Sequence, residues 1–568
     1  MADPATTLGV LDYVVFAALL TVTVITGLYH GVYKGGQTTT RQFLLADRKV
    51  FSIPIALTII ASFVSPVTLL GVPSEVYVYG PEYVTGTLNN LIMLPIAMVL
   101  YAPVFYGLNI MTCYQYLGIR YGYSMRAFGG FMFICQTVFY TGIVLFTPAL
   151  AIEAVTGFDL WLLILITGVV CTFYTSIGGL SAVIWTDVVM AIVVLTTIVL
   201  LIITGTKATG DFSYIWEVNE NASRTDLFQF PLDLTERFTF PSLFLGGLIS
   251  NLSLWGVSQT AVQRILSAKS LNQARVSLAM NVPLVIGILV ICALQGVVMY
   301  AYYYGPDPVD GTIRGPPNMT SPDQITVFFV EEQFGDIPGY LGLYISCLVA
   351  GSLSTISSNL NAMAAVVLVD ILRPFREWRS GKESLTHSEK RDTRLSKILV
   401  LIFGILSIAI SYLCVNLDTI VSLFNTIFGA VGGPLVGSFT LGMLWKRANT
   451  FGALIGAVTG FLMGVWVTLG SYVQDDSINM FGLFKLSFQW YSVMTLLTTL
   501  IVSVIMSEFF RCLDPEENVK EVDPSLLATF IRPKNYEVTS EDEDVVKSES
   551  KDLNENIKSI DDNESSDL

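Results

Sequence analysis

The stretch Gly351-Ser-Leu-Ser-Thr-Ile-Ser-Ser-Asn-Leu-Asn361 lies inside an apolar segment that is long enough to cross a membrane. It contains five hydroxyl side chains and two amides. Each polar group left unpaired in a bilayer costs several kcal/mol, so this many oxygen atoms need partners. Neutral oxygens on one helix face can replace the water around a sodium ion without holding the ion too tightly to leave. The stretch therefore predicts a small-cation site within a membrane-spanning helix.

The composition indicates an integral membrane protein. Of the 568 residues, 53% are hydrophobic and 14% are charged, and the mean hydropathy is +0.62. The first apolar run begins near Val10 and has no small-residue cleavage site, so we expect a retained span and not a signal peptide. Only two histidines are present, and the seven cysteines form no CxxC pair, so neither a histidine-built metal site nor a disulfide framework is expected. We expect no cofactor, no enzymatic activity and no binding of nucleic acid.

The acidic character of the chain is concentrated at its C-terminal end. From Arg511 onward the sequence has seventeen Asp and Glu residues against seven Lys and Arg residues. This segment, 511–568, is also poor in aromatic residues, so we predict a disordered cytoplasmic tail. Its last three residues, Ser566-Asp567-Leu568, match a ligand for a PDZ-domain protein.

Thirteen apolar runs are long enough to cross about 30 Å of hydrocarbon. They are 10–29, 52–78, 86–108, 128–153, 160–177, 183–206, 241–260, 277–304, 338–371, 396–416, 418–444, 451–472 and 490–510.

The loops between these runs predict the orientation of the chain. The Lys- and Arg-rich loops follow the first, seventh and ninth runs, so these loops should be cytoplasmic and the N-terminus extracellular. The basic residues after the seventh run are Arg264, Lys269 and Arg275. Two glycosylation sequons, at Asn221 and Asn318, then fall in extracellular loops, in agreement with the charge rule. We predict a multi-pass protein of the plasma membrane with a cytoplasmic C-terminus.

Three runs carry helix-breaking residues. Run 52–78 contains Pro66 and Gly71-Val-Pro73, run 241–260 contains Gly246-Gly247, and run 418–444 contains Gly429, Gly432, Gly433 and Pro434. The first two are five runs apart and cross in opposite directions, which is typical of inverted repeats around a midplane binding site. Half-helix ends offer carbonyl groups to cations and N–H groups to anions. The alternative is that these residues only allow close helix packing.

Six stretches together resemble the sodium:solute symporter family, in the branch of sodium-coupled monocarboxylate, multivitamin and iodide carriers. They are ASFVSPVTLLGVPSEVYVYG (61–80), PVFYGLNIMTCYQYLGIRYG (103–122), YTGIVLFTPALAIEAVTGFDLW (140–161), CTFYTSIGGLSAVIWTDV (171–188), GVSQTAVQRILSAKSLNQAR (256–275) and GSLSTISSNLNAMAAVVLVDILRP (351–374). The resemblance covers about 40–475. It implies an all-α leucine-transporter-type fold with a five-plus-five inverted repeat.

The resemblance also implies how the chain is divided. Residues 1–50 hold the extracellular N-terminus, the first span and a cytoplasmic loop. The first repeat is 51–206, and an extracellular loop, 207–240, leads to the second repeat at 241–445. Two peripheral spans at 446–510 precede the tail at 511–568.

The family's principal sodium site is implied at Ser354 and Thr355, completed by backbone carbonyls near Ala61 and Val64. The alternative for the two hydroxyls is hydrogen bonding to the preceding helical turn. A second sodium would use Ser65, Thr68 and Tyr140. Asp187 matches the acid on the family's inner sodium path, although an Asp in the first turns of a helix can also be a plain end charge.

The substrate positions depart further from the family. Thr68 and Gln136 resemble the monocarboxylate type, whereas Asn251 and Asn425 stand where iodide carriers have an aromatic and an apolar residue. The resemblance places the substrate beside Phe63, Thr68, Thr87, Asn90, Gln136, Tyr140, Asn251 and Asn425. Such a cavity suits a polar organic solute better than a large halide, although each amide could instead tie helices together.

These features predict a sodium-coupled symporter that imports small organic anions, monocarboxylates first, by alternating access. A multivitamin carrier for biotin and pantothenate, or an iodide carrier, is the alternative within the family. A sodium-gated channel or a non-transporting solute sensor is the alternative outside it.

Overall fold

The structure is a computed structural model that describes residues 8–29, 48, 50–231, 233–304, 316, 319–380, 389–415, 419–473, 480–513 and 522–532. These residues form helices and no strands. The long helices are α1 (Val10–Leu28), α8 (Tyr123–Thr156), α9 (Leu160–Thr209), α13 (Leu271–Tyr304), α15 (Tyr340–Val366), α17 (Glu389–Cys414), α18 (Ile420–Leu444), α19 (Thr450–Val473) and α20 (Tyr491–Leu513). The all-helical class predicted from the sequence is confirmed.

In the part of the chain that the structure describes, each of the thirteen predicted runs falls on one or more helical segments. Within the described residues, nine helices are long and apolar enough to cross a membrane, and one bent pair can form a tenth span. Three shorter apolar stretches are also present: Val10–Leu19 within α1, Leu160–Phe173 within α9, and Ser242–Trp255. The predicted runs 160–177 and 183–206 lie in one continuous helix, α9. The count of thirteen spans therefore stays a prediction.

The first broken helix is the predicted one. Helix α3 (Ser52–Phe63) ends at Val64, and after Pro66 the chain continues as a π-helical turn, Val67–Gly71, and α4 (Val72–Tyr79), bent by 57° from α3. Pro66 has no N–H group and disfavours a helical conformation at the residue before it, so the helix stops there. Gly71-Val-Pro73 does not break the chain a second time.

The second broken helix is interrupted further along than its sequence suggests. Gly246 and Gly247 sit within helix, because a π-helical turn (Ser242–Gly246) continues directly into α11 (Gly247–Trp255). The interruption comes after Trp255, and α12 (Gln259–Leu266) follows. The Phe63 and Trp255 rings, at the ends of α3 and α11, lie 3.9 Å apart. The two interruptions therefore meet inside the protein, as an inverted repeat requires.

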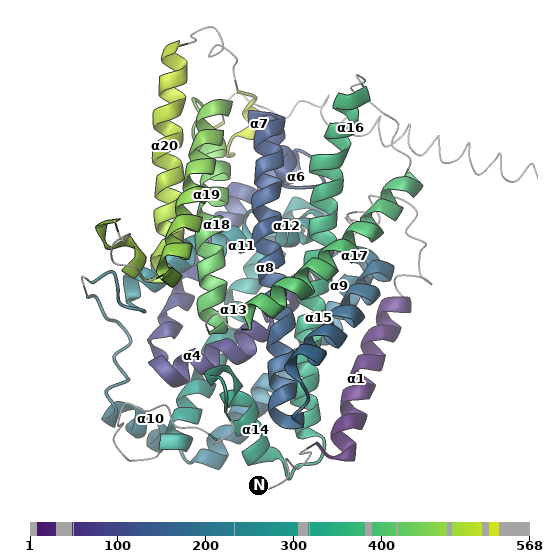
Figure 1. Cartoon of the computed structure of the whole chain (residues 1–568), viewed down its shortest axis with the longest axis vertical. Coiled ribbons are helices and arrows are strands. Elements are labelled where there is room, and N and C mark those ends of the chain that lie inside the picture. Colours follow the sequence, from purple (N-terminus) through teal and green to yellow (C-terminus); the bar gives the residue numbers. More distant parts are fainter. Residues whose placement is uncertain are drawn as a thin grey trace, which may run out of the picture.

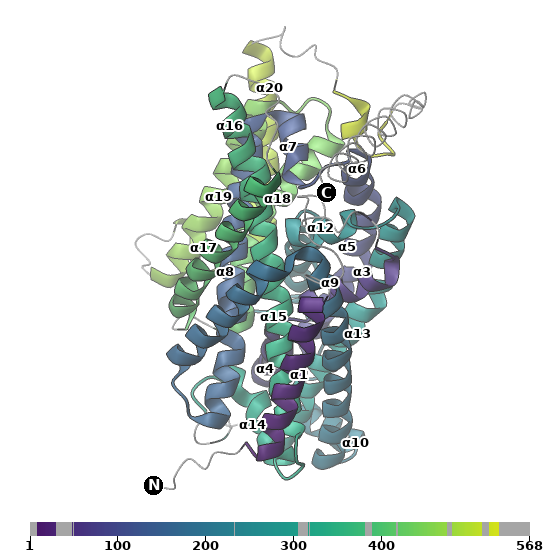
Figure 2. The ribbon, with the colours of Figure 1, turned by 90° about the vertical axis from the view of Figure 1, so that its right-hand side faces the viewer.

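The arrangement of helices gives the molecule two distinct ends. In Figure 1 the start of α1, α10 (Phe212–Asn221) and α14 (Ile325–Phe334) lie at the lower end, while α7 (Tyr114–Tyr121) and α16 (Arg373–Ser380) lie at the upper end. Figure 2 shows the same separation from the side, with α15 running between the two ends. Helix α15 is buried along nearly its whole length. The polar stretch therefore lies in the centre of the bundle.

Helix α18 is not interrupted at its glycines and proline. It is continuous from Ile420 to Leu444, and a Cβ added to Gly433 would clash with Thr495 of α20. The packing interpretation is therefore the right one for this run.

Glycines of α19 face hydroxyl residues of α20 in a regular series. Cβ atoms added at Gly452, Gly456 and Gly460 would collide with Ser507, Ser503 and Thr499 respectively. Both sets repeat every four residues, which puts each on one face of its helix. The two backbones therefore approach closely along several turns, as small residues allow in membrane helices.

Part of the predicted disordered tail is ordered. Residues 522–532 fold into a short turn with a 3₁₀ segment, Pro524–Leu526, and bury Leu526, Leu527 and Ala528. The prediction of a disordered tail is wrong for this stretch, because it contains the apolar run Leu526-Leu-Ala528 within an otherwise polar sequence. Ser566–Leu568, the predicted PDZ ligand, lies outside the described residues.

Candidate functional site

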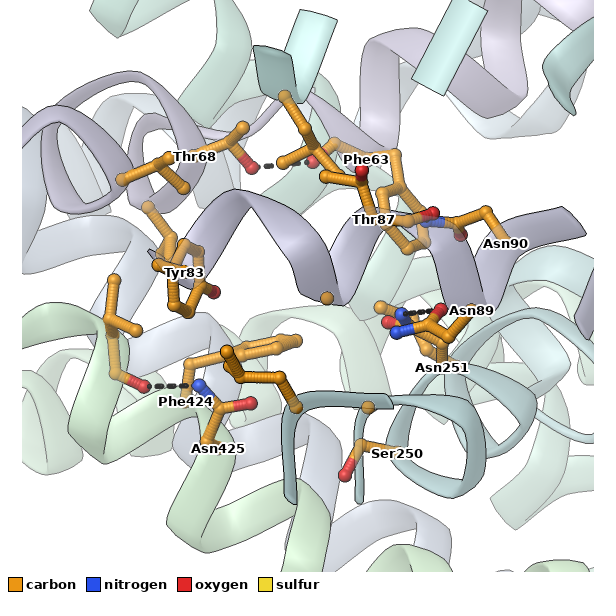
Figure 3. A pocket seen from close by; sticks show the side chains of 18 of the residues that line it. Phe63, Thr68, Tyr83, Thr87, Asn89, Asn90, Ser250, Asn251, Phe424 and Asn425 are labelled. Atoms are coloured by element: carbon orange, nitrogen blue, oxygen red, sulfur yellow. Dashed lines mark hydrogen bonds between the residues drawn. The ribbon is translucent and has the colours of Figure 1, made fainter. Parts of the chain in front are cut away.

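A cavity of about 100 Å³ lies between the break of the first broken helix and α11 of the second. It is lined by residues from the break of the first broken helix, the stretches Pro81–Gly107 and Ser242–Trp255, the helices α8, α13 and α18, and the turn before α20. Seven of the eight predicted substrate positions line it, namely Phe63, Thr68, Thr87, Asn90, Tyr140, Asn251 and Asn425. Figure 3 shows most of these side chains around the cavity.

Gln136 is the predicted substrate residue that does not line the cavity. It is buried on α8, and its amide nitrogen donates to Ser253 Oγ at 3.1 Å. This bond joins α8 to α11, so the geometry fits the helix-tying alternative at this position.

Four asparagines contribute polar groups to the cavity. Asn251 Nδ2 donates to Asn89 Oδ1 at 3.0 Å, and Asn425 Nδ2 donates to the Val421 carbonyl at 3.0 Å (Figure 3). Asn90 Nδ2 donates to the Thr87 carbonyl at 3.0 Å, whereas Asn90 Oδ1 is buried and accepts no hydrogen bond within the described residues. A buried acceptor without a partner costs about 1–3 kcal/mol, so Asn90 Oδ1 is a ready contact for a donor or a cation.

No charged side chain lines the cavity in the described part of the chain. The apolar walls come from aromatic rings, including those of Phe63, Tyr83 and Phe424. A few polar groups on an apolar wall are typical of small-molecule sites, in which the polar groups set orientation and specificity.

The three residues predicted for a second sodium also lie at this cavity. Ser65, Thr68 and Tyr140 all line it. Thr68 Oγ1 donates to the Phe63 carbonyl at 3.2 Å, and the Tyr140 hydroxyl interacts with the Ser65 side chain. The oxygen atoms at the break are thus partly paired with one another.

The predicted principal sodium positions meet where α15 passes the break of α3. Thr355 Oγ1 lies 3.1 Å from the Ser62 carbonyl and 3.0 Å from the Gly351 carbonyl in its own helix. The Val64 carbonyl oxygen lies 3.1 Å from the place a Cβ on Gly351 would take, so a larger residue would be tightly packed against the break. Ala61 and Val64 are both buried. The hydroxyl of Thr355 therefore makes both the helical back-bond and the contact to the break.

Ser354 faces a buried ion pair instead. Its hydroxyl donates to Asp187 Oδ1 at 2.5 Å, and Asp187 Oδ2 lies 3.2 Å from an Arg264 nitrogen. Asp187 is 0% exposed and Arg264 is 2% exposed. Asp187 sits in the middle of α9, so the end-charge alternative is wrong at this position.

Arg264 is the main residue that the sequence placed wrongly. It belongs to α12 and not to an exposed basic loop, because the second broken helix continues to Leu266. Its guanidinium also donates to Thr58 Oγ1 at 3.0 Å, to Ser358 Oγ at 2.5 Å and to Ser62 Oγ. A charge can be buried when it is paired and hydrogen-bonded in this way. The guanidinium thereby joins α3, α9 and α15.

A second ion pair links the loop before α11 to α4. Arg237, from the loop before α11, binds Glu75 of α4 at 2.6 Å, and Glu75 is buried. The same guanidinium lies over the Tyr79 ring at 4.2 Å. The loop is thereby fixed to the outer half of the first broken helix.

Residues 43–460 match the sequence model of the sodium:solute symporter family. The chain belongs to this family. Human sodium-coupled monocarboxylate transporter 1 is 38% identical over 467 residues, which are 82% of this chain and 74% of that protein. The sodium-dependent multivitamin transporter of Oryctolagus cuniculus is 38% identical over 470 residues, which are 83% of this chain and 72% of that protein.

The structure of a Na⁺-coupled sialic acid symporter in a substrate-bound outward-open state superposes with a TM-score of 0.75. It shares 24% sequence identity, and the superposition covers 88% of this chain and 98% of that one. The leucine-transporter-type fold is therefore confirmed. The chain is a multi-pass membrane transporter that couples a small solute to sodium, and it is not an enzyme.

The sequence reasoning missed other lining residues. Asn89 adjoins the predicted Asn90. The two consecutive amides are the sequence feature that could have indicated Asn89 as a lining residue. Gln489 comes from beyond both repeats, in the turn before α20, and no pattern in the sequence connects it with the cavity.

The buried ion pair makes a testable prediction. Asp187→Asn leaves the Arg264 guanidinium buried without a counter-charge and should destabilise the protein by about 3–5 kcal/mol. Adding Arg264→Gln should restore part of this loss, because the unpaired charge is removed. The measurement is thermal unfolding of the detergent-purified protein.

The control is Glu508→Gln, which removes an exposed carboxylate near Arg447 and Arg511. Exposed ion pairs contribute about 0–1 kcal/mol, so this variant should unfold like the wild type. A double variant no more stable than Asp187→Asn alone would contradict the account of the pair.

Proposed function

We propose that this protein is a plasma-membrane symporter that imports small organic anions, monocarboxylates first, on the sodium gradient. The observation that carries the proposal is an uncharged, amide-rich cavity beside a broken helix whose carbonyls face the hydroxyls of α15. Both monocarboxylate and multivitamin carriers are among its relatives.

Sodium supplies the positive charge that the cavity itself lacks. A carboxylate in a site without Lys or Arg must be balanced by a bound cation and by helix N-termini. The first broken helix resumes after Pro66, directly at the cavity. Binding of the anion would then depend on sodium, which makes the coupling obligatory.

The size of the cavity favours a small solute over a vitamin. Drug-sized ligands occupy pockets of roughly 300–1,000 Å³, whereas this cavity measures about 100 Å³. The amide nitrogens and hydroxyls favour a hydrogen-bonding solute over iodide. A multivitamin carrier remains the second candidate because the rabbit relative is as similar as the human one.

The sodium gradient is sufficient for this task. A tenfold gradient supplies about 1.4 kcal/mol per ion, and about 60 mV adds a similar amount per net charge. Two sodium ions with one monoanion then yield about 4.2 kcal/mol, or roughly a thousandfold accumulation.

In the proposed cycle, sodium at Ser354, Thr355 and the carbonyls near Ala61 and Val64 draws the first broken helix onto α15. The solute then fills the adjacent cavity, and the outer end closes. Arg264 must leave Asp187 before sodium can pass to the other side, so the ion pair serves as the inner barrier. Asp187 would then receive sodium on its way out.

Substitutions at the α15 hydroxyls test the sodium site. Ser354→Ala and Thr355→Ala should each raise the sodium concentration for half-maximal uptake about tenfold, because each removes a ligand oxygen worth about 1–1.5 kcal/mol. Uptake of radiolabelled lactate against sodium concentration is the measurement. Thr355→Ser, which keeps the oxygen, should behave like the wild type.

Ser357→Ala is the matched control on the same helix. The Ser357 hydroxyl bonds only to the Ser354 carbonyl, at 3.0 Å, among the contacts described. An equal rise in this variant, or no rise in Ser354→Ala and Thr355→Ala, would refute the site.

Asn251 tests the substrate class. Asn251→Leu leaves Asn89 Oδ1 without its donor and should weaken uptake of a hydrogen-bonding solute about ten- to a hundredfold, the equivalent of about 1–3 kcal/mol. The measurement is a panel of radiolabelled lactate, nicotinate, biotin, pantothenate and iodide, with and without sodium. Concentrative, saturable uptake would exclude the channel and the sensor. Wild-type iodide uptake with no response to the organic anions would refute the proposal.

Glycosylation tests the proposed orientation. Asn221 is exposed at the end of α10, whereas Asn318 and Asn563 lie outside the described residues. We expect glycosidase to shift the mass of the wild type but not of the Asn221→Gln, Asn318→Gln double variant. A shift that persists in the double variant would place the N-terminus on the cytoplasmic side or change the span count.

A further inference from the structure

The docked tail segment 522–532 connects helices from both repeats at the α7–α16 end. The Ala528 N–H donates to the Met443 carbonyl of α18 at 3.1 Å, and the Tyr116 hydroxyl of α7 donates to the Leu526 carbonyl at 3.2 Å. The segment also contacts α6 (Ala102–Gly107). Helices α6 and α7 follow the first broken helix, and α18 ends the second repeat.

The segment is folded as a defined unit. Asp523 Oδ1 accepts from the Ser525 N–H at 2.8 Å, and Arg532 donates to the Leu527 and Ser525 carbonyls at 3.1 and 2.9 Å. Leu527 is 1% exposed and Ala528 is 0% exposed, although the next residues turn back to solvent. Two buried leucines and an ordered turn indicate a specific docking site and not a passing contact.

The docking site is built from the unsatisfied end of α18. The last carbonyls of a helix have no partner within the helix. Arg120 of α7 satisfies those of Gly442 and Trp445, at 3.3 and 3.2 Å, and Ala528 satisfies that of Met443. Burial raises the pKa of the Tyr116 hydroxyl well above its usual range, so this group remains a donor.

We propose that residues 522–532 are an intramolecular latch that holds the α7–α16 end closed and must release for the solute path to open there. In this structure Arg264 and Asp187 are both buried, so neither group of the ion pair is open to solvent. The latch bonds α7 and α18 at once, so separation of the two repeats at this end breaks at least one of its attachments. The docked tail therefore stabilises the closed state and limits the rate of opening. The proposal rests on the alternating access described above, but not on the identity of the solute.

Native Cys113 reports the opening without any transported solute. It precedes α7, is 0% exposed, and its Sγ donates to the Val257 carbonyl in the break of the second broken helix at 3.3 Å. Opening of this end should expose the thiol. The experiment measures maleimide labelling of Cys113 by mass spectrometry in unsealed membrane fragments, which removes any dependence on orientation.

Three chains are compared with the wild type: Leu527→Asp, a chain that ends at Glu521, and a control chain that ends at Asn535. The first two should label Cys113 about three- to tenfold faster, because loss of the latch shifts a two-state equilibrium toward the open form. The control keeps the docked segment and should label like the wild type. Equal labelling in all four chains would overturn the latch.

A crosslink tests the latch in the full-length chain, without any truncation. Met443→Cys and Ala528→Cys, joined by a reducible bifunctional reagent, should abolish sodium-driven uptake of radiolabelled lactate, and reduction should restore it. Each single variant treated in the same way is the control. Full uptake in the crosslinked chain would refute the proposal, since the tail would then not need to move. A wild type that takes up no lactate would refute the proposed solute, and the labelling result would still decide the latch.

Discussion

The structure depends on one constraint, which is that the backbone groups freed at the break of α3 must find partners inside the membrane. The break at Val64 and Pro66 exposes carbonyls in a region where water cannot satisfy them. Helix α15 packs against these carbonyls. The Thr355 hydroxyl donates to the Ser62 carbonyl, and Gly351 lets the Val64 carbonyl approach. Ser354 then turns to Asp187. The interrupted helix and the polar helix are each stable only because the other is present.

The ion pair of Arg264 and Asp187 extends this network toward the α7–α16 end. A buried pair contributes little net stability because desolvation offsets the attraction, whereas separating its members is costly. Such a pair is better suited to distinguishing two conformations of the protein than to stabilising one of them. In the proposed cycle, sodium near Ser354 would compete with Arg264 for the same carboxylate, which would link the occupancy of the ion site to the position of the guanidinium.

The sequence was sufficient for the family, the helical class and the principal polar positions. The hydroxyl run from Ser352 to Ser358 is visible because polar residues are rare in an apolar segment, and Pro66 marks the first break directly. The second break was misplaced because Gly246 and Gly247 permit close packing as readily as they end a helix. The wrong placement of Arg264 follows from the misplaced break, since a basic residue beyond the end of a predicted span is assigned to a loop. The docking of Leu527 and the position of Gln489 at the cavity leave no local pattern in the sequence, because the residues that they contact lie far away along the chain.

The repeated contact of α19 with α20 has a mechanical consequence. Hydroxyl groups of α20 sit where the glycines of α19 leave room, and the spacing of four residues is close to one helical turn of 5.4 Å. If α20 slid along α19 by less than one turn, these hydroxyl oxygens would collide with side chains of α19. The two helices can rotate or translate together but cannot shear past each other by the small steps open to smooth apolar surfaces. In the proposed transport cycle, these two helices would therefore move as one rigid unit.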